Sequence, residues 1–294
     1  MKSLIELFIL LCLIIGMIPA LSSAQTAPDF REVEQILGVT GQMQEGAFVT
    51  SFPRSDIKVT IHGEPVPTAF GFGSWTAWKN MGNEMMVMGD LVLLEKEINP
   101  VISALAEANI NVTALHNHFL GEKPRIMYMH IHGVGDVTVL AIGIRKALDN
   151  TATPRSHPVA SNAFPALDTK RIEQIIEHPG HAGGGIFKIT VGRPGVKIHG
   201  IELTSSMGLN SWVAFIGTNE RAHIAGDIAM TANEVNPVIR SLRKHGIKIL
   251  AVHNHMLDEE PRIFFLHYWG AGKAENLARA FRDALAHTKK MEVK

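Results

Sequence analysis

Cysteine is nearly missing from this sequence, and that excludes several kinds of site. The only cysteine, Cys12, lies in an apolar run near the start of the chain. If that run is removed, the mature chain can form no disulfide and no cysteine-ligated metal centre. A lipoprotein carries its cysteine at the cleavage site, so Cys12 is not expected to carry a lipid.

An excess of either charge sign is also missing, because 28 lysines and arginines balance 28 aspartates and glutamates. Nucleic-acid-binding domains carry a basic surface, so no nucleic-acid partner is expected. The sequence lacks the nucleophile elbow of the serine hydrolases. Its glycine run at 183–185 lacks the lysine and the spacing of a phosphate-binding loop. Whether the protein is an enzyme stays open, but any reaction would use a metal or general acid-base chemistry.

The first residues have the pattern of a secretory signal peptide. A lysine at position 2 precedes a largely apolar run at 4–21, and small residues follow at 22–24. We therefore expect a signal peptide at 1–24 and an exported protein, periplasmic or secreted, with no membrane span after cleavage. The alternative is an uncleaved N-terminal membrane anchor.

One segment of the sequence occurs twice, at 116–133 and at 253–270. Each copy contains a His-Asn-His triplet, a Pro-Arg pair and a third histidine. The offset between the copies, 253 minus 116, is 137 residues, and it holds without a gap from Val59/Val196 to Gly135/Gly272. A repeat of this length predicts two copies of one structural unit.

The repeat also sets the expected domains and fold class. We expect repeat domains at 28–150 and 166–290, joined by a linker at 151–165 that is rich in Pro, Ser, Thr and Asn. Asn99-Pro100 and Asn236-Pro237 are interpreted as an N-cap residue followed by proline at the first helical position. The predicted class is α+β, with two tandem repeats of an α-β-β-β-β-α-β-β-α unit whose helices pack on a mostly antiparallel sheet. The two units are expected to pack about a pseudo-twofold axis.

The repeated histidines are the main candidates for chemistry. Strand alternation places His116 and His118 on one face, and the return strand brings His130 beside them. Neighbouring strands hold side chains about 5 Å apart, which suits three nitrogen ligands around one zinc ion. A centre for zinc or another divalent transition metal is therefore predicted in each repeat, with these ligands: His116, His118 and His130 in the first, and His253, His255 and His267 in the second. The alternative is a buried, hydrogen-bonded layer of structural histidines.

Carboxylates at matching positions could complete such a centre. Glu97 and Glu234 lie just ahead of the two Asn-Pro pairs, and we predict them as catalytic residues that act on a metal-bound water. Their structural alternative is to stabilise a helix N-terminus. Asp90 and Asp227 also match, although Gly-Asp is a common turn sequence.

Two functions are consistent with these residues. The first is an exported metal-binding protein that acts as a zinc-dependent hydrolase. The second is a non-catalytic binding module of the cell envelope, in which Trp75 and Trp212 line a pocket and the histidines are structural. In both cases the expected partner is a small molecule or a cell-envelope glycan.

The duplicated His-Asn-His, Pro-Arg and histidine pattern behind an export signal resembles the LppY/LpqO family of exported bacterial proteins. The resemblance covers nearly the whole mature chain. It implies export and a tandem domain of unknown function, and it implies no reaction. Members of that family look like lipoproteins, whereas this chain has no cysteine at the processing site.

Overall fold

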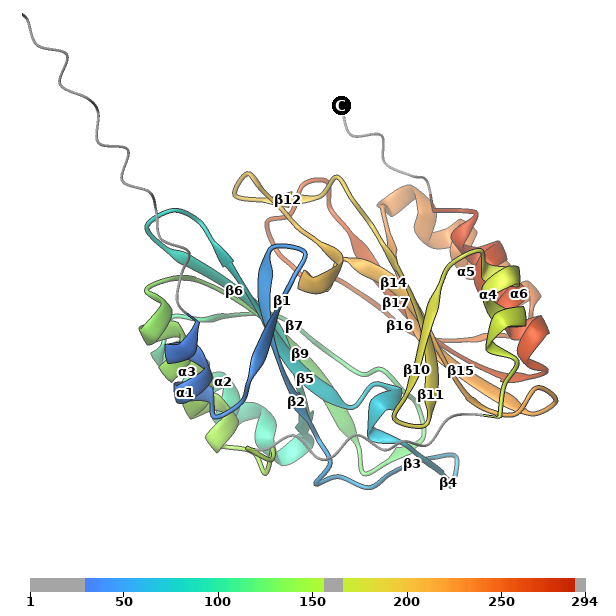
Figure 1. The fold of residues 1–294 in the computed structure, drawn as a ribbon, viewed down its shortest axis with the longest axis horizontal. Coiled ribbons are helices and arrows are strands. Elements are labelled where there is room, and N and C mark those ends of the chain that lie inside the picture. The colour runs from blue at the N-terminus through green and yellow to red at the C-terminus, as the bar shows by residue number, and fades with distance from the viewer. Residues whose placement is uncertain (1–29, 156–165, 289–294) are drawn as a thin grey trace, which may run out of the picture.

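The structure is a computed structural model that describes residues 30–155 and 166–288. The predicted signal peptide and most of the predicted linker lie outside these residues. Within the described ranges, no helix combines the length and apolar character needed to cross a membrane. The two repeats form two similar halves, which Figure 1 colours from blue to green and from yellow to red.

The first half is built on a six-stranded sheet with the strand order β1-β2-β5-β6-β9-β7. All neighbouring strands in this sheet are antiparallel. A smaller sheet has the order β4-β3-β8. The elements are α1 (Arg31–Leu37), β1 (Gly41–Gln44), β2 (Ala47–Pro53), β3 (Val59–Ile61), β4 (Glu64–Val66), η1 (Thr68–Phe70), β5 (Gly73–Asn80), β6 (Met85–Leu94), η2 (Glu95–Glu97), α2 (Ile98–Glu107), β7 (Asn111–His116), β8 (Glu122–Lys123), β9 (Ile126–Gly135) and α3 (Val137–Asp149).

The second half repeats this plan with the antiparallel order β10-β11-β14-β15-β17-β16. Its elements are α4 (Thr169–Ile176), β10 (Gly180–Gly183), β11 (Ile186–Gly192), β12 (Lys197–Ile198), β13 (Ile201–Glu202), η3 (Ser205–Met207), β14 (Asn210–Gly217), β15 (Ala222–Met230), α5 (Ala232–Lys244), β16 (Lys248–His253), β17 (Phe264–Gly272) and α6 (Ala274–Leu285). The predicted fold class, two α+β repeats with helices on antiparallel sheets, is confirmed.

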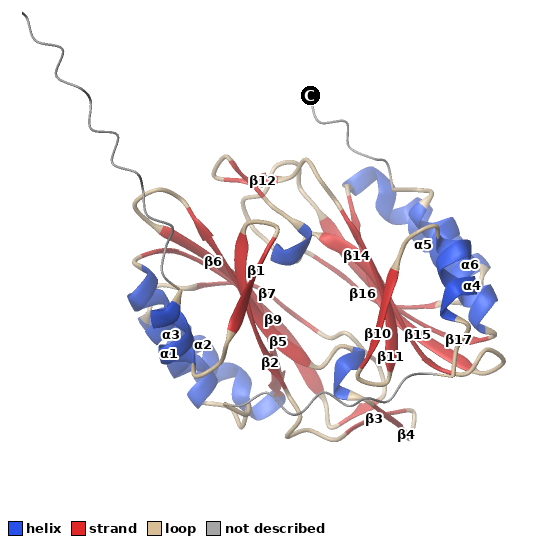
Figure 2. Cartoon of the chain, in the orientation of Figure 1, coloured by secondary structure: helices blue, strands red, loops and turns tan. Residues whose placement is uncertain are grey.

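The two sheets face each other, and the helices cover their outer faces. Figure 2 shows α1, α2 and α3 on one flank, α4, α5 and α6 on the other, and the strands between them. Strand β6 shows how the sequence produces these layers. Val87 and Leu91 pack with the helices of their own half, whereas Met86 and Met88 pack with residues of the other half, such as Phe265. Because both faces are covered, the strand is a nearly continuous apolar run.

Helix α5 begins earlier than the sequence predicted. It starts at Ala232 after the N-cap residue Thr231, and Pro237 lies inside it. The side chain of Glu234 accepts a hydrogen bond of 2.8 Å from the backbone N–H of Thr231. This capping box satisfies a donor at the helix start, so the assignment of Asn236 as the N-cap was wrong.

The first half makes the same contact in a different local structure. Glu97 accepts a hydrogen bond of 2.8 Å from the backbone N–H of Leu94, and a short 3₁₀ turn leads directly into α2. Asn99 therefore lies inside α2 and is not its N-cap. The edge strands β1 and β10, which pair with β2 and β11, were not predicted, since they are short and rich in glycine or polar residues.

Candidate functional site

The predicted histidines occupy matching places in the two halves. One histidine ends β7 or β16, one follows that strand by two residues, and one lies within β9 or β17. In chain order these residues are His116, His118, His130, His253, His255 and His267. The β7–β9 register places His130 opposite Ala114, as the predicted hairpin requires. All six rings lie in the region where the two sheets face each other.

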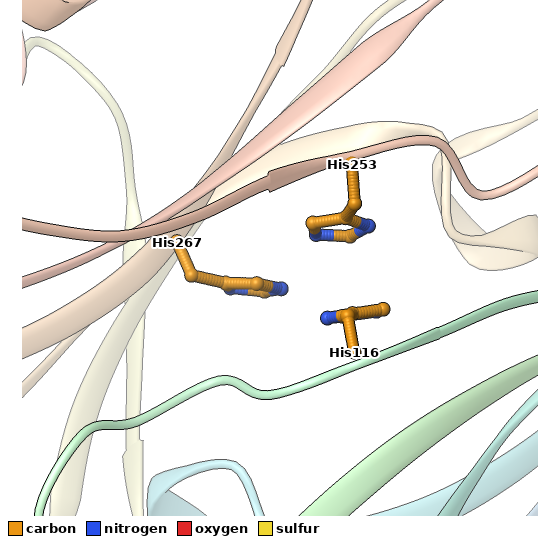
Figure 3. A group of neighbouring side chains, drawn as sticks. All are labelled: His116, His253 and His267. Carbon is orange, nitrogen blue, oxygen red and sulfur yellow. The ribbon is translucent and has the colours of Figure 1, made fainter.

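The closest groups of metal-ligating atoms combine both halves. In one group, a ring nitrogen from each of His116, His253 and His267 lies within 4.8 Å of the other two. Figure 3 shows this group, with His116 on the green strand of the first half and its two neighbours on strands of the second. A second group with the same limit consists of His130, His253 and His255. From the sequence, each set of three ligands was expected to come from a single repeat. Periodicity along a strand gives no information about which other sheet faces that strand.

An approximate twofold axis relates the rings. His116 and His253 occupy equivalent positions in the repeat, and their ring centroids are 3.5 Å apart. Two flanking contacts are equivalent to each other under the repeat: His118 with His267 at 3.7 Å, and His130 with His255 at 3.8 Å. The six histidines therefore form one cluster shared by the repeats.

Aromatic residues fix the two outer rings. His118 stacks on Tyr128 with a centroid distance of 3.3 Å, and His255 stacks on Phe265 at 3.4 Å. Tyr128 and Phe265 are matching residues of β9 and β17. The stacking restricts how each imidazole can rotate, so the cluster is held in one arrangement.

Backbone carbonyls determine which ring nitrogen carries the proton in three of the histidines. Each of three Nδ1 atoms lies within hydrogen-bond distance of a carbonyl oxygen: His116 and Asn117 at 3.2 Å, His253 and Asn254 at 3.0 Å, and His267 and Gly226 at 3.2 Å. A carbonyl can only accept, so each Nδ1 carries the proton and each Nε2 has a free lone pair. Histidines that bind metals through Nε2 are held in this way.

His130 brings a second ring nitrogen against that of His116. Its Nε2 lies 2.9 Å from Nε2 of His116. The contact is a hydrogen bond when one of the two Nε2 atoms carries a proton, and a metal ion bound by both nitrogens would take the place of that proton. In tetrahedral coordination, two nitrogens at about 2.0–2.1 Å from one zinc ion are roughly 3.3–3.4 Å apart.

The remaining ring nitrogens are not satisfied by protein atoms. Among the described residues, Nε2 of His253, His255 and His267 is buried without a hydrogen bond, and so are both ring nitrogens of His118. Each unsatisfied buried group costs about 1–3 kcal/mol. Hydrogen bonds between the described residues therefore do not by themselves satisfy the whole cluster.

Burial keeps the imidazoles neutral. It lowers the pKa of His116 to about 3, and the neighbouring His253 adds to that shift. Burial also lowers the pKa well below the usual value in four further rings: His118, His130, His255 and His267. Since only a neutral imidazole binds a metal, the cluster is in its ligating form at neutral pH.

Two aspartates lie beside the cluster, and the sequence named them only as carboxylates that could complete a centre, with a turn role as the alternative. Oδ2 of Asp227 lies 3.5 Å from Nε2 of His255 and 3.8 Å from Nε2 of His267. Burial raises the pKa of its counterpart Asp90 to about 8, and the charge of Asp227 adds to the shift. The strand register places Asp90 opposite His130 and Asp227 opposite His267. In the sequence, the only sign that these aspartates belong to the site is that they occupy matching positions in the two repeats.

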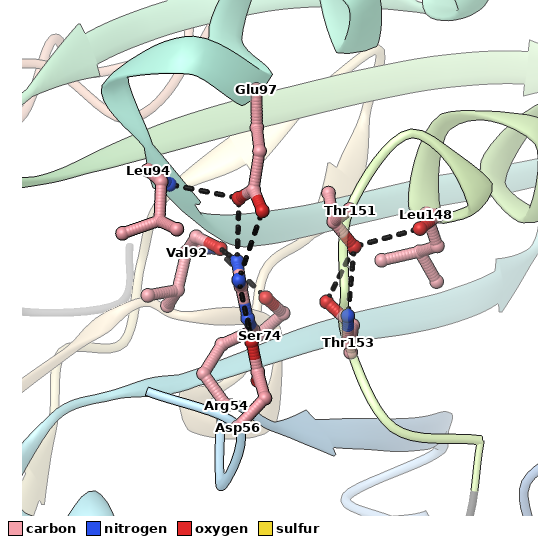
Figure 4. A network of polar contacts seen from close by, with 9 residues as sticks. All are labelled: Arg54, Asp56, Ser74, Val92, Leu94, Glu97, Leu148, Thr151 and Thr153. Carbon is pink, nitrogen blue, oxygen red and sulfur yellow. Dashed lines mark hydrogen bonds and ion pairs between the residues drawn. The ribbon is translucent and has the colours of Figure 1, made fainter. Parts of the chain in front are cut away.

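Glu97 and Glu234 belong to buried ion pairs. Glu97 accepts hydrogen bonds of 2.8 and 3.1 Å from the guanidinium of Arg54, as Figure 4 shows. Glu234 pairs with Arg193 at 2.8 Å. Neither glutamate belongs to the two histidine groups, and the catalytic role assigned to them stays a prediction. Their contacts are those of residues that hold the start of a helix against the sheet.

A cavity of about 880 Å³ lies beside the histidine cluster. Its wall includes three of the histidines and both aspartates: His118, His130, His255, Asp90 and Asp227. Trp75 and Trp212, which the sequence analysis selected, also line it, together with Lys188. The volume is in the range of small-molecule sites. A molecule in this cavity would contact both imidazoles and carboxylates.

Comparison with known proteins identifies the repeated unit. The family model described as Domain of Unknown Function (DUF1259) matches residues 31–150 and 170–287, which are the two halves of the structure. No curated protein matches the chain. Similar solved structures include the trimeric bacterial microcompartment shell protein PduB, 14% identical over 85% of this chain and 94% of that chain, with a TM-score of 0.20. Another is EtuB from Clostridium kluyveri, 10% identical over 83% and 90% of the two chains, also with a TM-score of 0.20.

Proposed function

This chain belongs to the DUF1259 family, and we propose that it is a metalloprotein that binds a divalent transition-metal ion between its two repeats. The proposal depends on one observation, that ring nitrogens of His116, His253 and His267 lie within 4.8 Å of one another. The Nε2 atoms of His253 and His267 are buried without a hydrogen bond among the described residues, and a metal ion would supply the partner that they lack.

Zinc is the first choice of metal. A set of neutral imidazoles suits zinc, copper or nickel, whereas magnesium and calcium prefer oxygen ligands. The chain has no cysteine after Cys12, so it offers no thiolate ligand to a metal that prefers sulfur. His116, His253 and His267 form the group that we assign as ligands, with His130 next to it.

We further propose that the centre acts in hydrolysis of a small molecule. A zinc ion held by His116, His253 and His267 would leave a position for water, and it would lower the pKa of that water to about 7. Asp227 lines the cavity, and its carboxylate lies 3.5 Å from Nε2 of His255. It is therefore placed to accept a proton at the wall where a substrate would lie.

A non-catalytic binding module is the second candidate, because the cavity has two tryptophans on its wall. In this case the histidines would be structural, and the cavity would bind a ligand without turnover. The exported location expected from residues 1–24 is part of both proposals. The two candidates differ in metal binding and in turnover.

Metal content tests the proposal directly. The full chain would be purified without a histidine tag, stripped with a chelator and titrated with zinc, and metal per chain would be measured by mass spectrometry. We expect at least one ion per chain and its loss in His253→Ala, since His253 belongs to both groups. His181→Ala is the matched control, because this histidine is exposed and lies on β10. Failure to bind zinc, copper or nickel would exclude the metalloprotein and favour the binding module, and metal without turnover of ester, amide or phosphoester substrates would exclude the hydrolase.

A further inference from the structure

Lys188 is the only lysine or arginine among the residues that line the cavity. Its ammonium nitrogen lies 4.4 Å from the ring centre of Trp212, and within residues 30–155 and 166–288 it has no hydrogen bond or ion pair. Burial lowers the pKa of Lys188 to about 8, although the charge of Asp227 raises it. The amine is therefore mostly charged at neutral pH. Asp227 is near enough for its charge to act on this half-buried amine, but no carboxylate among the described residues pairs with it directly, so the position favours an anionic ligand.

Only one of the two repeats has a cation at this position. In the first half, Val49 of β2 pairs with Ala77, and in the second half Lys188 of β11 pairs with Ala214. Val49 and Lys188 are thus equivalent, and both line the cavity. The cavity has a cation at one of the two equivalent positions and an apolar side chain at the other. A ligand that suits it has one charged end and one uncharged end.

Two tryptophans supply flat apolar surface in the same cavity. A Cβ atom on Gly208 would lie 2.9 Å from the indole of Trp75, and one on Gly71 would lie 3.8 Å from the indole of Trp212. Each indole therefore rests against a glycine of the other repeat. Both indoles are only partly buried and line the cavity, so their exposed surface is available to stack on a ring.

From these features we propose that the cavity binds a ring-bearing carboxylate. Its carboxylate pairs with Lys188, and its ring packs on Trp75 or Trp212, next to Asp227 and the histidines. The inference deepens the proposed function by naming its ligand class. It rests on that function only in placing the ligand beside a metal ion, and binding is expected in metal-free protein as well.

Calorimetric titration of the full chain with two acids tests this inference. The probes are glucuronate, which carries a sugar ring, and benzoate, which carries an aromatic ring, with glucose and benzyl alcohol as their uncharged controls. We expect at least one acid to bind, both in chelator-treated and in zinc-loaded protein, and its uncharged analogue to bind at least tenfold more weakly. The acid that binds more tightly identifies the ring.

Variants of Lys188 make the test specific. Lys188→Met is expected to weaken binding of the acid at least tenfold, whereas Lys197→Met, at an exposed lysine outside the cavity, leaves it unchanged. Adding Val49→Lys to Lys188→Met returns a cation from the other repeat and is expected to restore part of the affinity. Circular dichroism confirms that each variant is folded, and Lys188→Gln replaces Lys188→Met if the latter is not.

The outcomes separate this inference from the metal proposal. Zinc binding without binding of either acid overturns the ligand class alone. Acid binding without any metal overturns the metalloprotein alone. Equal affinity of the acid for Lys188→Met and the unaltered protein also overturns the inference, because the cation would then have no part in recognition.

Discussion

His116 and His253 stack on each other with ring centroids 3.5 Å apart, although they come from different repeats. Neither repeat contains either three-histidine group by itself, because each group takes ligands from both. The duplication thus builds the site, in addition to enlarging the core. Since β7 and β16 both end at this contact, the metal centre and the packing of the two halves depend on each other.

Zinc is expected to stabilise the fold. A ligand that binds only the folded state adds about 2.7 kcal/mol of stability at a hundredfold excess over its Kd. We therefore expect a higher midpoint of denaturant unfolding for zinc-loaded protein than for metal-free protein. The increase is expected to disappear in His253→Ala and to persist in His181→Ala. An equal increase in His253→Ala would show that zinc binds elsewhere.

The role of Glu97 can be separated into structural and catalytic parts. Arg54 is completely buried and bonds to both oxygens of Glu97, and removal of one member of a buried ion pair costs about 3–5 kcal/mol. Glu97→Ala is therefore expected to lower the free energy of unfolding by this amount, measured by denaturant titration. If the residue is structural, the folded variant keeps its zinc affinity and any turnover. Loss of turnover at unchanged stability would instead establish the catalytic role predicted from the sequence.

The sequence predicted the repeat, the order of most elements and the histidines, because these follow from local patterns. Strand alternation placed His116 and His118 on one face and the return strand brought His130 beside them, and the observed register has His130 opposite Ala114. The contact between the histidines of the two repeats could not be predicted, because no periodicity shows that His253 faces His116. Asp227 was named as a carboxylate that could complete a centre but was not selected as a site residue, because its Gly-Asp sequence resembles a turn, whereas it lies in the middle of β15. Glu97 was interpreted as a site residue because its partner, Arg54, is distant in the chain.

Gly208 is expected to be needed for the position of Trp75. Its φ is +86°, and a Cβ atom there would lie 2.9 Å from the indole. Gly246 provides a matched control, since its φ is +77° and a Cβ atom would meet nothing within 4 Å. Both alanine variants carry the cost of a left-handed conformation, about 1 kcal/mol, but Gly208→Ala must also displace an aromatic ring. We expect Gly208→Ala to lose about 1–3 kcal/mol more stability than Gly246→Ala, and to weaken binding of the acid in the cavity. Equal losses in the two variants would contradict the close contact with Trp75.

The buried histidines also predict how stability depends on pH in metal-free protein. In the unfolded chain each has a pKa of about 6.5, and in the fold burial lowers that of His116 to about 3 and that of others well below the usual value. Between the two values the unfolded chain binds a proton that the folded protein does not. The contribution is therefore fully present above the unfolded value and is lost as the pH falls through this window, with a slope of about 1.4 kcal/mol per pH unit for each histidine.

Asp90 changes the pH dependence of stability in the opposite direction, but it is one group against several histidines. Its pKa is raised from 3.8 to about 8 in the fold, so its contribution is lost as the pH rises between these values. Below the unfolded histidine pKa the several imidazoles outweigh it, and we expect the free energy of unfolding to fall by several kcal/mol between about pH 7 and pH 5. Denaturant titrations of chelator-treated protein at intermediate pH values measure this slope. His253→Ala should reduce the slope, because burial lowers the pKa of His253 as well. A stability that is flat or rises on acidification would mean that the imidazoles are already protonated in the fold, which is incompatible with a cluster of neutral metal ligands.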